Sequence, residues 1–309
     1  MDPVTQRMYL QEFVAAVATR TDNEYQKLFE DIMEMRFPND FVRVRPAGKE
    51  GDWKCDGFLR SAGTVFQVYA PSSPLNISKL TTKMRKDYLG SRTHWKTQMR
   101  SWIFHHNQMK GTYPQVLGLL QELYTQHKDV ELSIEGPSYL RSHMLALNEV
   151  DLQVLFGVVP TMSDYSNLRY EHIEAVLSHV ATTQGAIGDD VRPVPPDKVK
   201  YNNLSDDSVS FLELGMPKSD IVRRYFTQHP DPSLGDQVAA VYAGTYEQLK
   251  IAGYNPDDIF GHLYHDFVSS LPSRSPSTYA AAHAMLSYFF EECDIFERPL
   301  DGLQHATPN

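Results

Sequence analysis

The chain has 309 residues, of which 41% are hydrophobic and 11% aromatic, and it carries a formal net charge of −10. This composition excludes a disordered or collagen-like chain, and two cysteines are too few for a disulfide framework or an all-thiolate metal site. Apolar runs are far shorter than the roughly 20 residues that span a bilayer, and the first residues lack the features of a signal peptide. We therefore expect a soluble, cytoplasmic protein without a membrane partner.

The charge is divided unevenly along the chain. Residues 1–130 carry 18 basic and 14 acidic side chains, whereas residues 131–309 carry 11 and 25. Within residues 36–100 the balance is 13 basic to 5 acidic. Such an asymmetry indicates that one half approaches a polyanion and the other repels it, with a chance excess spread around the surface as the alternative.

Helical and strand patterns alternate in the first part of the chain. Apolar side chains recur at helical spacing in some segments and at every second residue in others. The expected elements are a helix at 23–36, strands at 41–45, 55–60 and 65–69, a helix at 77–88, a strand at 102–104, a helix at 114–126, a strand at 132–134 and a mostly helical stretch at 140–156. This order predicts an α/β domain in which a mixed sheet is flanked by helices.

Proline and glycine interrupt every period between residues 185 and 197, which predicts a linker. Behind it almost every segment has helical periodicity, so an all-α domain is expected there. The predicted organisation is an α/β domain over 1–185, a linker over 186–200, an acidic helical domain over 201–299 and a tail over 300–309.

Polar side chains gather on the two strands of the predicted hairpin. Strand alternation places Lys54 and Asp56 on one face, and Gln67 and Tyr69 on one face of the next strand. A tight turn would bring the Asp56 end close to the Gln67 end. A carboxylate, an amide oxygen and the backbone carbonyl of Val68 at one sheet edge form an oxygen-rich site suited to Mg²⁺ or Mn²⁺.

This hairpin and the order of elements between residues 25 and 104 resemble the PD-(D/E)XK, or restriction-endonuclease-like, superfamily. Its core is a helix, a hairpin carrying Asp and then (Asp/Glu/Gln)-x-Lys, a further helix and another strand. The resemblance implies that Asp56 and Gln67 hold Mg²⁺, that Asp52 assists, and that activated water hydrolyses DNA phosphodiesters. The alternative for Asp52 and Asp56 is that they cap turns beside glycines.

The lysine position of that motif holds Tyr69, which by default is an aromatic residue that packs on the sheet. Lys54 is the expected substitute for the motif lysine, and Lys79 or Lys83 on the next helix are less direct ones. The superfamily often adds a carboxylate from the first helix, and Glu30 is the expected residue. A solvated helix face is the alternative for Glu30.

A basic region with interleaved aromatic side chains follows the hairpin. It fits contacts with the phosphate backbone of DNA, which position the duplex without reading bases, and a solvated basic helix is the alternative. The expected DNA-binding side chains are Lys79, Lys83, Arg85, Lys86, Arg92 and Lys96.

Four longer strings, at residues 51–58, 66–71, 102–107 and 288–299, resemble bacterial ABC-three-component defence proteins. These are similar in turn to nuclease effectors of Lamassu-type anti-phage systems. The resemblance implies an SMC/Rad50-like ABC ATPase partner, in some cases a third small subunit, and a helical C-terminal domain used for assembly. We therefore expect a metal-dependent DNA endonuclease effector that such an ATPase activates. The alternative is a catalytically degenerate nuclease-fold scaffold or DNA-binding subunit of the same kind of complex.

Overall fold

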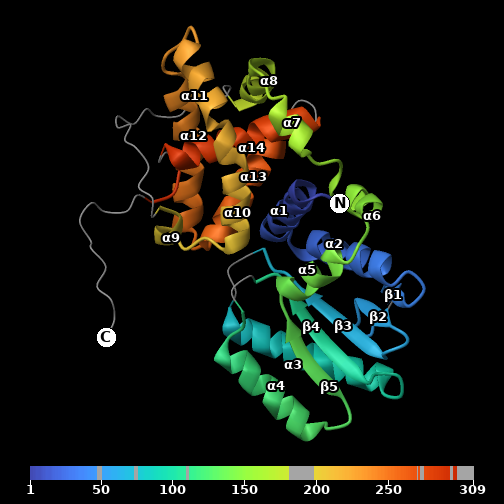
Figure 1. Cartoon of the computed structure of the whole chain (residues 1–309). Coiled ribbons are helices and arrows are strands. Elements are labelled where there is room, and N and C mark those ends of the chain that lie inside the picture. Colours follow the sequence, from blue (N-terminus) through green and yellow to red (C-terminus); the bar gives the residue numbers. More distant parts are fainter. Residues whose placement is uncertain are drawn as a thin grey trace, which may run out of the picture. The chain divides into compact units, whose positions relative to one another are not determined.

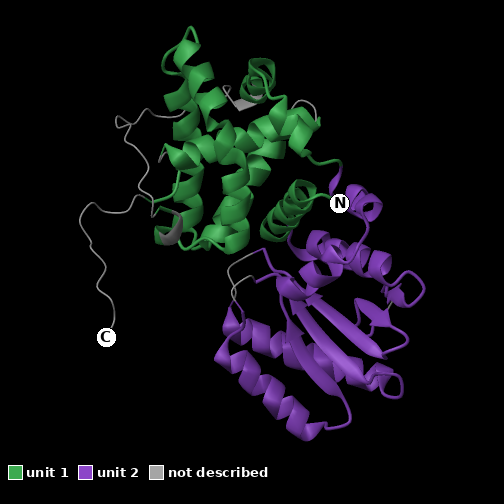
Figure 2. Ribbon diagram, in the orientation of Figure 1, with its two compact units in different colours: residues 1–19, 158–309 green, residues 20–157 purple. Residues whose placement is uncertain are grey.

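The structure is a computed structural model that describes most of the chain. The described residues are 1–46, 51–72, 76–108, 111–180, 198–269, 271, 275–292 and 295–297. The chain divides into two compact units, shown in Figure 2: unit 2 is residues 20–157, and unit 1 is residues 1–19 together with 158–309.

Unit 2 is built on a five-stranded sheet with the strand order β1-β2-β3-β4-β5 (Figure 1). The strands are β1 (Phe41–Arg43), β2 (Gly57–Leu59), β3 (Thr64–Tyr69), β4 (Ser101–His106) and β5 (Glu131–Glu135). The first three pair antiparallel, and β3, β4 and β5 pair parallel. The helices of this unit are α2 (Asp22–Arg36), α3 (Ile77–Trp95), α4 (Pro114–Gln126), α5 (Pro137–Leu145) and α6 (Glu149–Phe156). The predicted mixed sheet with flanking helices is confirmed.

Alternation along β3 gives the sheet two buried faces. Val65 belongs to a core cluster with Met84 of α3 and Leu123 of α4. The next residue, Phe66, points to the opposite face, where its ring lies 5.4 Å from that of Phe29 in α2. Each fully buried side chain of this size contributes about 1.5–3 kcal/mol to stability. Helices therefore cover both faces, and polar side chains inside these layers stand out as exceptions.

The helix α3 begins with a side-chain cap and runs to Trp95, beyond the predicted end at residue 88. Asn76 Oδ1 accepts a hydrogen bond from the backbone N–H of Lys79 at 3.0 Å, which satisfies one of the free donors of the first turn. Buried Leu80, Met84 and Tyr88 then recur at helical spacing and hold the helix on the sheet. Lys79 and Lys86 of the same helix are exposed, and Lys83 is half-buried.

In the part of the chain that the structure describes, unit 1 consists of helices. These are α1 (Pro3–Thr19), α7 (Met162–Ser166), α8 (Tyr170–Val180), α9 (Lys198–Tyr201), α10 (Asp206–Gly215), the 3-10 helix η2 (Met216–Lys218), α11 (Ser219–Gln228), α12 (Leu234–Ile251), α13 (Pro256–Ser269) and α14 (Pro276–Glu291). The nearly all-buried α14 contacts α7, α8, α10, α11 and α13. No helix among the described residues has the length and apolar character needed to cross a membrane.

The compact units differ from the domain limits expected from the sequence. Residues 1–19 and 158–180 cluster with the C-terminal helices, because α1 packs on α13 and α10, and α8 packs on α14. The close approach of α1 to α13 depends on Gly261 of α13, where a Cβ would lie 2.9 Å from Cβ of Ala18 in α1. Residues 186–197 of the expected linker and the expected tail at 300–309 lie outside the described residues, and α9 begins at Lys198.

Candidate functional site

Asp56 and Gln67 lie side by side on the hairpin of unit 2. Asp56 directly precedes β2, and its Oδ2 accepts hydrogen bonds from Gln67 Nε2 at 2.6 Å and from the N–H of Val68 at 2.7 Å. Both side chains are buried, at 6% and 5% exposure. Gln67 Oε1 is buried without a hydrogen-bond partner among the described residues. An unsatisfied buried amide oxygen is costly, so its presence beside a carboxylate indicates a position prepared for a ligand.

Burial raises the pKa of Asp56 to about 7. The nearby carboxylates of Asp52 and Glu30 raise it further, whereas the N–H of Val68 and the ammonium of Lys83 lower it. A carboxyl group in this environment exchanges its proton near neutral pH, and a bound cation would favour the ionised form.

A cavity of about 510 Å³ opens beside Asp56, and Asp52 and Glu30 also line it; we call it the carboxylate pocket. Glu30 is 1% exposed, so the solvated-face interpretation of this residue is wrong. Its Oε2 accepts a hydrogen bond from Arg45 Nη2 at 2.8 Å, and Arg43 lies 3.5 Å away. The alternation of Arg43 and Arg45 along the segment after α2 is the sequence signal for these ion pairs.

Within the described ranges no three His, Cys, Asp or Glu side chains are placed to hold a metal ion by themselves. Mg²⁺, however, is usually bound through one or two carboxylates, with water and substrate phosphates completing the octahedron. The Asp56 carboxylate offers one such oxygen, and Gln67 Oε1 offers a second if the Gln67 amide rotates. The N–H and C=O of one strand residue point to the same neighbouring strand, and the N–H of Val68 points to Asp56. The Val68 carbonyl therefore faces the Asp56 side of β3 as well. These residues fit a magnesium ion shared with a substrate.

Tyr69 occupies the motif's lysine position and packs on the sheet. Its ring centroid lies 5.9 Å from that of Phe104, within the cluster beneath α3 and α4. Lys83 of α3 reaches over it, with Nζ 5.4 Å from the ring centroid. The same ammonium lowers the pKa of Asp56. Positive charge therefore reaches this position from α3, while β3 itself contributes an aromatic ring.

Lys54 does not share a face with Asp56, which corrects the expectation from strand alternation. The strand β2 begins only at Gly57, and residues 51–54 form a turn in which Trp53 and Lys54 have φ of 55° and 56°. This left-handed backbone turns Lys54 toward α3, where its Nζ lies 3.5 Å from Asp87 Oδ1. Asp52 and Asp56 line the carboxylate pocket, and Lys54 lines a different one.

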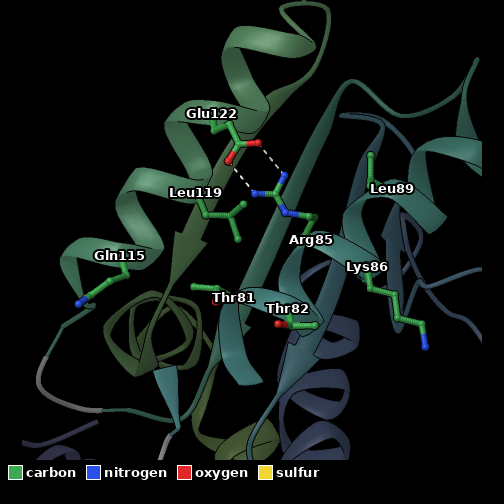
Figure 3. A pocket seen from close by; sticks show the side chains of 8 residues that line it. All are labelled: Thr81, Thr82, Arg85, Lys86, Leu89, Gln115, Leu119 and Glu122. Carbon is green, nitrogen blue, oxygen red and sulfur yellow. Dashed lines mark hydrogen bonds and ion pairs between the residues drawn. The ribbon is translucent and has the colours of Figure 1, made fainter. Parts of the chain in front are cut away.

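The six predicted DNA-binding side chains have different surroundings in the structure. Arg85 forms two hydrogen bonds with Glu122 of α4, at 2.7 and 2.6 Å, across the groove between α3 and α4 (Figure 3). Arg92 pairs with Asp129 at 3.0 Å. Lys96 is exposed beyond the end of α3. The remaining three, Lys79, Lys83 and Lys86, line one cavity together with Lys54.

The match to a known protein family lies in unit 1. Residues 171–297 match the family model of C-terminal domain 10 of the ABC-three component (ABC-3C) systems. The chain thus carries an ABC-3C-type C-terminal domain. This match supports membership in an ABC-three-component system, as the sequence resemblance predicted, and the domain spans α8 to the segment after α14. No curated protein and no solved structure matches the chain.

Proposed function

We propose that unit 2 is a metal-dependent DNA endonuclease domain within an ABC-three-component defence complex. The observation that carries the proposal is the buried Asp56–Gln67 pair with its unpartnered amide oxygen. The element order α2, β1, β2, β3, α3, β4 around that pair agrees with the restriction-endonuclease-like core. The ABC-3C-type domain would serve assembly, and an SMC/Rad50-like ATPase would control the nuclease.

In this proposal the residues of unit 2 have different roles. Asp56 and Gln67 hold Mg²⁺ or Mn²⁺, which when bound supplies Lewis acidity and a more acidic water. Asp52 lines the same pocket and would accept hydrogen bonds from water that accompanies the metal. Glu30 is a positioning residue, because Arg43 and Arg45 already compensate its charge. Lys83 orients the attacking water or neutralises the phosphate in place of the motif lysine.

Plasmid cleavage by the full-length protein, alone and with its ATPase partner, tests the proposal. Asp56→Asn and Gln67→Ala are expected to lower the rate of nicking in Mg²⁺ or Mn²⁺ at least about 100-fold. Glu149→Gln is the matched control, because this acidic side chain of α6 is exposed and lies outside both pockets. Cleavage that is unchanged in Asp56→Asn would overturn the assignment.

A scaffold or DNA-binding subunit with a degenerate site is the second candidate. The observation that favours it is Tyr69, whose ring packs against Phe104 where the motif has a lysine. This candidate predicts that Asp56→Ala and Gln67→Ala leave assembly, DNA binding and anti-phage defence intact. Loss of defence with retained assembly in those variants would reject it.

A further inference from the structure

We propose that Lys54, Lys79, Lys83 and Lys86 form a phosphate-binding pocket for a nucleic-acid strand. They line a cavity of about 410 Å³ on the surface of unit 2, together with Asp87. Lys79, Lys83 and Lys86 follow one another at helical spacing on α3, so their ammonium groups share one face of the helix. This inference rests on the proposed function only for the identity of the strand, not for the anion chemistry.

The charges in this lysine pocket are not balanced. Asp87 is 1% exposed, and its carboxylate pairs with Lys83 at 2.5 Å and with Lys54 at 3.5 Å. Lys79 and Lys86 make no ion pair with any residue in the part of the chain that is described. Four cations around one anion repel each other, and an incoming phosphate would relieve that repulsion.

The backbone around Lys54 and Gly90 holds the Lys54 side chain in the pocket, and this distinguishes the pocket from a row of lysines on one helix. Lys54 enters from a left-handed turn, which costs free energy for a residue with a side chain. Ser91 Oγ holds the carbonyl of Lys54 at 2.5 Å. Gly90 leaves room for the lysine stem, since a Cβ at that position would lie 2.7 Å from Lys54 Cγ. A glycine inside a helix costs about 1 kcal/mol, and here it permits this approach.

The lysine pocket lies beside the carboxylate pocket. Segment 52–56 separates the two, because Asp52 and Asp56 line one and Lys54 lines the other. Lys83 lines the lysine pocket and also lowers the pKa of Asp56. A strand that places one phosphate on the lysines therefore runs past the carboxylates. The pocket accepts either an internal phosphodiester or a terminal phosphate.

Binding of fluorescent single-stranded oligonucleotides to the full-length protein, in EDTA and at low salt, tests this inference. The double variant Lys79→Gln/Lys86→Gln is expected to bind at least about tenfold more weakly, with a salt slope smaller by about 2. Lys128→Gln/Lys218→Gln removes the same charge elsewhere and is expected to have a smaller effect. A 5′-phosphorylated probe that binds more tightly than its 5′-hydroxyl counterpart identifies a terminal phosphate, and equal binding identifies an internal one.

Gly90→Ala tests the geometry without changing any charge. The added methyl group displaces Lys54, so we expect about threefold to tenfold weaker binding. Gly118→Ala, in α4, meets no atom within 4 Å and serves as the control. Unchanged binding in both Gly90→Ala and the double lysine variant would overturn the pocket. Because these measurements contain no divalent metal, that result would leave the cleavage test of Asp56→Asn untouched.

Discussion

Replacing Asp56 with asparagine tests whether its carboxylate serves function or stabilises the fold. Burial raises the pKa of Asp56 from an ordinary value of 3.8 to about 7. One pKa unit corresponds to about 1.4 kcal/mol, so the ionised carboxylate costs the folded state about 4 kcal/mol in metal-free solution. The asparagine oxygen still accepts from the N–H of Val68, and a rotated Gln67 amide accepts from the new NH₂ group. We expect Asp56→Asn to raise the free energy of unfolding by about 2 kcal/mol or more.

The pH dependence of this gain has a definite sign. The unfolded chain ionises Asp56 near its ordinary pKa of 3.8, and the folded chain ionises it near 7. Between those values the folded state binds more protons, so this group lowers the stability of the wild type as pH rises. The advantage of Asp56→Asn should therefore be small near the lower value, grow toward pH 7 and remain constant above it.

Urea-induced unfolding of the full chain, monitored through hydrogen exchange of the β2 and β3 amides, measures the stability of unit 2. Mg²⁺ is expected to stabilise the wild type and to leave Asp56→Asn unchanged, because the neutral asparagine amide lacks the negative charge of the carboxylate ligand. The exposed control Glu149→Gln should shift stability by less than about 0.5 kcal/mol. If Asp56→Asn proves less stable than the wild type above pH 7, the carboxylate holds the hairpin and the functional argument fails.

Two further predictions concern packing and protonation. Gly57→Ala places a Cβ 2.4 Å from Phe41 Cζ and should destabilise unit 2 by about 1–3 kcal/mol in urea unfolding, whereas the open position of Gly118 should tolerate alanine without loss. Burial lowers the pKa of His283 to about 3, while the unfolded chain binds a proton near 6.5. Unit 1 should therefore lose about 1.4 kcal/mol through this group one pH unit below 6.5. His283→Gln should flatten that slope, and an unchanged slope would contradict the assignment.

Local patterning predicted the sheet of unit 2 well. Each strand expected from alternation is present, and the hairpin of β2 and β3 brings Asp56 beside Gln67. These features depend on side-chain period and on a short turn, which neighbouring residues determine. The ends of β2 were less predictable, because the left-handed turn at Trp53 and Lys54 interrupts the alternation before the strand begins.

Packing between distant segments could not be predicted from the sequence pattern. The helix α1 has apolar residues all around, with Met8 and Phe13 fully buried, and nothing local indicates that it packs on α13. Glu30 was expected as the carboxylate of the first helix, with a solvated helix face as the alternative, and its ion pair with Arg45 was not predicted. Periodicity shows which residues share a face of a helix or strand, and it does not show which helix or strand lies opposite them.

Net charge is a poor guide to where unit 2 would meet a polyanion. Unit 1 carries 11 basic and 23 acidic side chains, and unit 2 carries 18 and 16, which is close to neutral. Yet the ion pairs of Arg85 and Arg92 on α3 compensate those cations, whereas the described acidic residues leave Lys79 and Lys86 uncompensated. Exposed ion pairs contribute at most about 1 kcal/mol, so their arginines remain available at the cost of breaking a weak contact. The phosphate contact is therefore expected to begin at the lysine pocket and to extend toward Arg85 only if the strand also displaces Glu122.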